Sequence, residues 1–149
     1  MSVTDQTFQI AQSSGGDWQD LTAKCLADLG AIPNSANLGF VYVTDSLDED
    51  LRQILNQLRA KTRIHDWLGT IGFGICTSST ELFDIPAMAV MVGKVPRDSY
   101  CILPTINSTE DDLPPDVLNW AETHTPALGI VHADPRVPGL EAIFTRIQE

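Results

Sequence analysis

The chain has 149 residues, of which 43% are hydrophobic, so it is long enough and apolar enough to form one domain with a real core. Its 20 acidic and 9 basic residues give a formal net charge of −11, which repels nucleic-acid phosphates and anionic lipids. We therefore expect neither nucleic acid nor a membrane as a partner, and favour a small polar molecule or another protein.

The start of the chain and the cysteines predict a reducing, cytoplasmic location. No basic residue is followed by an apolar block near the N-terminus, and no stretch approaches the roughly 20 apolar residues that span a bilayer. The three cysteines form no CxxC motif, and each lies in an apolar run. We predict that Cys25, Cys76 and Cys101 are buried free thiols, without a zinc site or a disulfide.

The first elements predicted along the chain are a strand and a helix. Residues 7–12 alternate between apolar and polar side chains, which is typical of an edge or half-buried strand. After a break at residues 13–16, Asp17 can cap a helix with apolar residues at helical spacing. Gly30 can end that helix in a left-handed conformation.

The second pair of elements is a buried strand and an amphipathic helix. Residues 38–43 are almost continuously apolar, as in a parallel-sheet strand that helices cover on both faces. Ser46 and Glu49 have the spacing of a capping box, in which each side chain accepts a hydrogen bond from the other residue's backbone N–H. The helix that follows carries an apolar stripe of Leu51, Ile54, Leu55 and Leu58.

The middle of the chain predicts more strands and one more helix. The glycine-rich run at residues 67–76 predicts a strand, and a hydroxyl-rich loop follows at residues 77–80. Residues 87–92 and 100–103 predict two further strands. After a polar, acidic loop, Pro114 and Pro115 start a helix with Val117, Trp120 and Ala121 facing inward.

Residues 128–134 repeat the pattern of residues 38–45. Each run begins with Leu-Gly, continues through β-forming residues, reaches an Asp, and is followed by a short loop and an amphipathic helix. The second helix, with its stripe of Leu140, Ile143, Phe144 and Ile147, ends with the chain. We therefore predict a buried strand at residues 128–133, and we expect residues 1–149 to be one domain from a longer protein.

The predicted fold class is α/β, with a mixed, mainly parallel sheet flanked by helices and internal strand–helix repetition. Ligands of parallel sheets bind beyond the carboxyl ends of the strands. If residues 38–43, 68–75 and 128–133 are parallel neighbours, the polar groups after these strands lie together on one rim of the sheet. Such a rim could hold the amine or hydroxyl groups of a small molecule. The candidate ligand-binding residues on this rim are Thr44, Asp45, Gly72, Gly74, Cys76, Thr77 and Asp134. The alternatives are that the glycines serve close packing and that the two aspartates only cap turns.

The sequence contains no recognisable catalytic or metal-binding motif. The glycines of the glycine-rich run lack dinucleotide-binding spacing, and neither a Walker motif nor a nucleophile elbow occurs. His65, His124 and His132 lack the spacing of a zinc site. His132 lies in a predicted buried strand, where a lone histidine is more often a hydrogen-bonded core residue than a ligand. We predict that the chain is not an enzyme and holds no metal.

Four apolar runs, at residues 38–45, 68–75, 85–92 and 128–135, carry a family resemblance by their order and spacing. Together with the helix after the first run, they resemble the N-terminal part of the FIST family of intracellular sensory domains. The resemblance covers most of the chain and implies binding of small ligands, amino acids or related metabolites among them. It also implies signalling to an attached or partner effector. The family's usual Gly-Cys is Gly74-Ile75-Cys76 here, which implies an altered pocket at that point.

Two alternative functions stay open at this point. Some FIST members are also implied to bind haem and sense nitric oxide, and His132, His65 or His124 would then supply the axial ligand. No other cofactor is expected. The acidic surface also suits a protein-interaction scaffold domain without a ligand. Strand edges left exposed by a truncation could pair copies of the chain, so a homo-oligomer is a further expectation.

Overall fold

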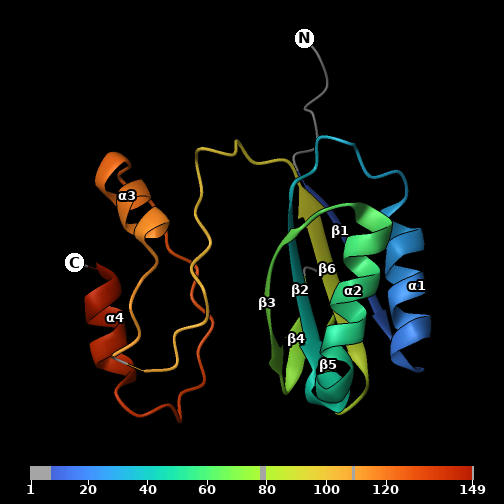
Figure 1. Ribbon diagram of the computed structural model, residues 1–149. Coiled ribbons are helices and arrows are strands. Elements are labelled where there is room, and N and C mark those ends of the chain that lie inside the picture. Colours follow the sequence, from blue (N-terminus) through green and yellow to red (C-terminus); the bar gives the residue numbers. More distant parts are fainter. Residues whose placement is uncertain (1–7, 78–79, 109, 149) are drawn as a thin grey trace. The chain divides into compact units, whose positions relative to one another are not determined.

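A computed structural model of the chain describes residues 8–77, 80–108 and 110–148 (Figure 1). It has a mixed α/β content, with both parallel and antiparallel strand pairs. The chain divides into two compact units, residues 1–95 and 96–149, and each is described by itself. Among the described residues, no helix is both long enough and apolar enough to cross a membrane.

The first unit is built on a four-stranded sheet. Its strands lie side by side in the order β1 (Phe8–Ser14), β6 (Ala87–Gly93), β2 (Leu38–Thr44) and β3 (Asp66–Gly72). β6 is antiparallel to both β1 and β2, whereas β2 and β3 are parallel. The predicted edge position of β1 is therefore confirmed, but a mainly parallel sheet is not. β2 and β3 are parallel neighbours, as the predicted rim required.

Two helices, α1 (Trp18–Leu29) and α2 (Leu51–Thr62), pack on one face of this sheet (Figure 1). Alternate residues of β2 and β6 point toward them, because successive side chains of a strand point to opposite faces. The core between sheet and helices is a single apolar cluster, whose fully buried members include Leu21, Cys25, Val43, Ile54, Leu58, Met88 and Val92.

Helix α1 begins and ends at the predicted residues. The Asp17 carboxylate accepts a hydrogen bond of 2.9 Å from the Asp20 backbone N–H, which satisfies one of the unpaired donors of the first turn. Gly30 ends the helix with a positive φ of 67°, a conformation that costs glycine little because it has no Cβ.

The start of helix α2 differs from the prediction. A 3-10 helix, η1 (Asp45–Asp50), precedes it, and the capping box does not form. The Glu49 N–H donates to the Asp48 carboxylate at 2.6 Å, and the Ser46 hydroxyl lies 3.1 Å from the Thr44 hydroxyl. Because neighbouring side chains already bond these groups, the Ser46–Glu49 prediction is wrong.

The glycine-rich run forms two strands instead of one. β3 ends at Gly72, and the short strand β4 (Gly74–Cys76) begins after Phe73. β4 pairs antiparallel with β5 (Glu81–Phe83), a strand that was not predicted, in a separate two-stranded ladder. The ladder with β2 stops at Gly72 because its partner, Thr44, is the last residue of β2. Residues 78–79 of the predicted hydroxyl-rich loop lie outside the described residues, as does Thr7 of the predicted first strand.

The second unit contains the two predicted helices, α3 (Pro115–Thr123) and α4 (Leu140–Gln148). Val117 of α3 and Ile143 of α4 are buried. The strands predicted at residues 100–103 and 128–133 are wrong, since both segments are irregular loops. A run of β-forming residues becomes a strand only when another strand satisfies its backbone, and the described part of this unit contains no strand to pair with.

Candidate functional site

The parallel ladder brings the carboxyl ends of β2 and β3 together. Thr44, the last residue of β2, is paired in register with Gly72, the last residue of β3. β4 follows Gly72 after one residue and lies close to β2. The predicted site residues from Thr44 to Thr77 therefore belong to one end of the first unit.

Thr44 has a structural role at this end. Its side chain is 1% exposed, and its hydroxyl donates to the Ile85 carbonyl at 2.9 Å. The same oxygen accepts a hydrogen bond of 2.9 Å from the Ala87 N–H. These bonds tie the end of β2 to the start of β6, so the hydroxyl is already satisfied without a ligand.

Close packing accounts for two of the glycines. A Cβ on Gly74 would lie 2.2 Å from Cδ1 of Phe83, whose ring therefore covers this position. A Cβ on Gly69, which has a φ of 156°, would lie 1.7 Å from the Val41 carbonyl oxygen. At Gly72 the nearest atom to such a Cβ is the Gly74 carbonyl oxygen at 3.3 Å, a tight contact that is still longer than those at Gly74 and Gly69.

Thr77 closes the turn of the β4–β5 hairpin. Its N–H donates to the Thr80 carbonyl at 2.9 Å, and its hydroxyl lies 3.3 Å from the same oxygen. The amide of Gln12, on the edge strand β1, donates to the Thr80 hydroxyl at 3.4 Å. Thr77 and Thr80 are thus bonded to each other between β4 and β5.

The cysteines differ in burial, in contrast to the prediction. Cys25 is buried in the core, where burial, with a smaller effect of the Asp28 charge, raises the pKa of its thiol to about 12. Cys101 is half-buried, and burial raises its pKa, with Asp116 adding to the effect. Cys76 is exposed, so its predicted burial is wrong: it ends a strand whose ladder is separate from the main sheet.

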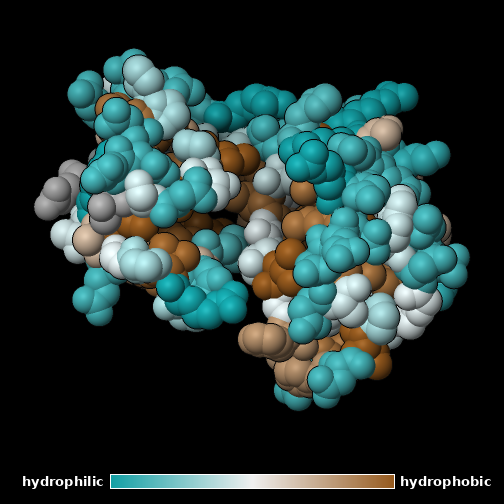
Figure 2. Space-filling model, turned by 60° about the horizontal axis from the view of Figure 1, so that its bottom comes forward, coloured by the Kyte–Doolittle hydropathy of each residue, from teal (hydrophilic) through white to brown (hydrophobic). Residues whose placement is uncertain are grey.

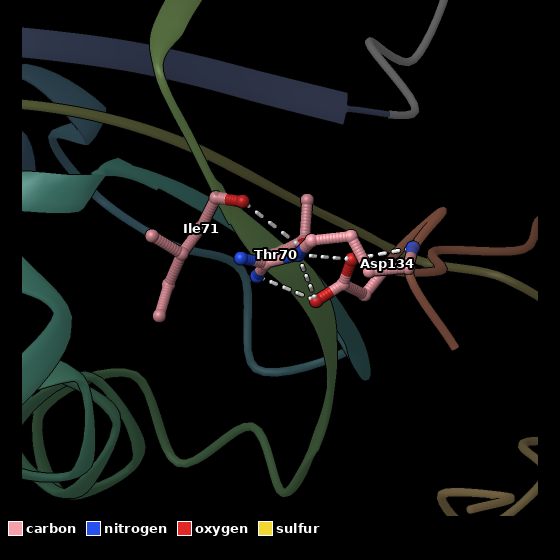
Figure 3. A network of polar contacts seen from close by, with 4 residues as sticks. Thr70, Ile71 and Asp134 are labelled. Carbon is pink, nitrogen blue, oxygen red and sulfur yellow. Dashed lines mark hydrogen bonds and ion pairs between the residues drawn. The ribbon is translucent and has the colours of Figure 1, made fainter. Parts of the chain in front are cut away.

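Asp134 lies in the second unit, and the strand predicted to carry it is absent. Its carboxylate forms an ion pair of 2.7 Å with the Arg136 guanidinium and accepts the Arg136 backbone N–H at 2.9 Å (Figure 3). These hydrogen bonds lower the pKa of Asp134 to about 2. This geometry is that of an aspartate capping a turn.

Figure 3 also draws a bond within the first unit, from the Thr70 hydroxyl to the Ile71 carbonyl at 3.3 Å.

The histidines are dispersed over loops and a helix end. His124 stacks on Trp120, with 4.6 Å between ring centroids, and its Nδ1 lies 2.9 Å from both the Thr123 hydroxyl and the Trp120 carbonyl. His132 is half-buried in an irregular loop, and His65 is exposed. Within the described residues, no group of three or more His, Cys, Asp or Glu could hold a metal ion.

Two surface hollows lie away from the predicted residues. One, in the second unit, is small and is lined mainly by Ile106, Leu113, Ile143 and Ile147. The other is an open groove along η1 and α2, lined by residues between Asp48 and Arg59. Neither hollow includes a residue of the predicted rim.

No protein-family model matches this chain, and no curated protein matches it. The resemblance to the FIST family therefore stays a prediction, and the function has to be proposed from the residues themselves.

One surface at the site end was not predicted from the sequence. Ile71, Phe73, Phe83 and Ile85 are large apolar residues with exposed side chains, and we call this set the hairpin patch. They flank and include the β4–β5 hairpin, beside the carboxyl ends of β2 and β3. The available signal was the placement of Phe73 between two glycines, where a side chain has little support from its neighbours.

Proposed function

We propose that the chain is a cytoplasmic sensory domain that binds a small polar molecule, an amino acid or a related metabolite, and signals to an attached or partner effector. The observation that supports a site is the parallel register of β2 and β3, which pairs Thr44 with Gly72 at the carboxyl ends of both strands. Small molecules bind beyond such ends in sheets with parallel strands. The FIST-like order of the apolar runs supports the sensory role.

The roles of the rim residues follow from their exposure. Asp45 is exposed directly after β2, and its carboxylate can accept hydrogen bonds from a ligand's ammonium group. Cys76 is exposed at the end of β4. Gly72 is paired with Thr44 at the carboxyl ends of β2 and β3. Thr44, Gly74 and Thr77 hold the strand ends and the hairpin in place. No catalytic step is assigned to these groups.

Thermal unfolding of the full chain with a panel of amino acids and related amines tests the proposal. A ligand that binds only the folded state at about 100 times its Kd adds about 2.7 kcal/mol of stability, which raises the Tm. We expect Asp45→Asn to remove this rise for ligands with an amine. The matched control is Asp28→Asn, which removes the same charge from an exposed position on α1. A panel without a single stabilising compound contradicts the proposal.

The proposal does not extend to haem. The strand that was predicted to hold His132 is a loop, and the residues on both sides of it, Val131 and Ala133, are exposed.

A further inference from the structure

The four side chains of the hairpin patch leave a large apolar surface exposed to solvent. The exposed fractions are 86% for Phe73, 53% for Phe83, 39% for Ile85 and 37% for Ile71. Large exposed apolar side chains that the backbone holds at one end of a unit can form a surface that binds another molecule. Aromatic side chains in particular supply much of the binding energy of protein interfaces.

The backbone holds these four residues at one end of the first unit. Ile71 lies at the end of β3, and Phe73 immediately precedes β4. Phe83 is paired with Gly74 in the β4–β5 ladder and covers it with its ring. Ile85 is fixed to the end of β2 by the bond from the Thr44 hydroxyl to its carbonyl. Figure 2 shows brown and tan atoms gathered at this end, with teal atoms beside them.

The charges around the hairpin patch have one sign. The sequence from residue 67 to residue 93 contains no Lys or Arg, and its charged residues are Glu81 and Asp84. Both are exposed, Glu81 on β5 and Asp84 directly after Phe83. Asp45, exposed after the end of β2, adds a third carboxylate at this end.

We infer that the hairpin patch is a docking surface for a cationic amphipathic segment of a partner protein. The partner's apolar side chains cover Phe73 and Phe83, and its Lys or Arg side chains meet Glu81, Asp84 and Asp45. Charge complementarity selects this occupant, because a second copy would bring its own acidic rim and an anionic lipid surface would be repelled. The inference does not rest on small-ligand binding, and it gives the domain a route to its effector.

Fluorescence anisotropy with two short labelled peptides tests the inference on the full chain. Both are amphipathic leucine helices, one with lysine and one with glutamate on the polar face. We expect the lysine peptide to bind and the glutamate peptide not to bind, with binding weakened by added salt. Phe73→Ser should weaken binding about tenfold or more, because a central aromatic contact is lost. Phe73 is 86% exposed, so this change should leave the far-UV circular dichroism unaltered.

Ile10→Ser is the matched control. Ile10 is 66% exposed on β1, outside the hairpin patch, so its replacement should leave the Kd unchanged. The double variant Glu81→Gln and Asp84→Asn should weaken binding and flatten its salt dependence. Equal binding of the two peptides, or no binding of either, overturns the inference. Self-association of the wild-type chain that Phe73→Ser abolishes also overturns the inference. Binding to anionic phosphatidylglycerol vesicles that Phe73→Ser abolishes overturns it too. Retention of the thermal shift with small ligands in Phe73→Ser separates this surface from the small-ligand site.

Discussion

Strand β2 and residues 128–134 have similar sequences and different structures. β2 is buried along most of its length, with Val41 2% exposed and Val43 not exposed at all. In residues 128–134, by contrast, Leu128 is 79% exposed and Val131 is 52% exposed, and the backbone is irregular. The same pattern, Leu-Gly followed by β-forming residues and an Asp, thus gives a central strand in one place and a loop in the other.

The difference lies in the neighbours of each segment. β2 has a ladder on both sides, with β6 and with β3, so its backbone N–H and C=O groups are satisfied within the sheet. Val41 and Val43 also face the two helices that cover the core. Residues 128–134 have no ladder with any other described residue. A run of β-forming residues therefore shows that a segment is able to form a strand. Whether the strand forms depends on a neighbouring strand to pair with.

Hydrogen exchange should show the largest difference between the two segments. Amide protection in a central strand approaches that of global unfolding, so β2 amides should exchange about a thousandfold more slowly than amides of residues 128–133, or more. Mass spectrometry of peptides from both segments measures this ratio. Slow exchange at residues 128–133 would mean that these amides are hydrogen-bonded, and would break the comparison.

A matched pair of valine substitutions gives the next largest effect. Val43→Ala removes a fully buried side chain and should lower the free energy of unfolding by about 2 kcal/mol. Val131→Ala changes a side chain that is 52% exposed and should alter it by no more than about 0.5 kcal/mol. Urea unfolding of both variants gives the two values. Similar losses at the two positions would show that Val131 is packed in solution.

The smallest effect concerns Asp134, the aspartate that ends the second of the two similar runs. Arg136→Ala removes the partner that lowers the pKa of Asp134 to about 2, so that pKa should rise toward its ordinary 3.8. Because the folded-state pKa is the lower one, the stabilisation is present above the ordinary value and is lost as the pH falls through about 2. NMR titration of the side-chain carboxyl measures the shift. Arg146→Ala, in the same unit, is the control and should leave the pKa of Asp134 unchanged. An unaltered Asp134 pKa in Arg136→Ala would contradict the ion pair.

Local signals predicted the elements whose stability is mostly local. The Asp17 cap, the positive φ of Gly30 and the apolar stripe of α2 were all predicted from short spacings, since they depend on residues within a turn or two. The antiparallel insertion of β6 between β1 and β2 was not predicted, because pairing between residues far apart in sequence leaves no local mark. The break of the glycine-rich run at Phe73 depends on the same kind of pairing.

The candidate site was predicted in part for a similar reason. The predicted rim depended on three runs being parallel neighbours. This condition holds for β2 and β3, whose carboxyl ends meet, and fails for residues 128–133. The bonds of the Thr44 hydroxyl to Ile85 and Ala87 could not be predicted without knowing where β6 pairs. The ion pair of Asp134 with Arg136 could not be predicted without knowing that a turn follows Asp134. Exposure of the hairpin patch follows from the small size of β4 and β5, which the apolar content of the run could not reveal.

The strand order has a consequence for the newly made chain on the ribosome. Within the described part of the chain, β6 is the strand that pairs with β1, so Phe8–Ser14 has no strand partner there until Ala87–Gly93 has been synthesised. At about 5–20 residues per second, the nascent segment waits several seconds with its strand-forming groups unpaired. The residues of α1, β2 and β3 are synthesised earlier, and β6 pairs with both β1 and β2 in the finished sheet. A translational pause before residue 87 would lengthen this wait and with it the exposure of the nascent chain to chaperones.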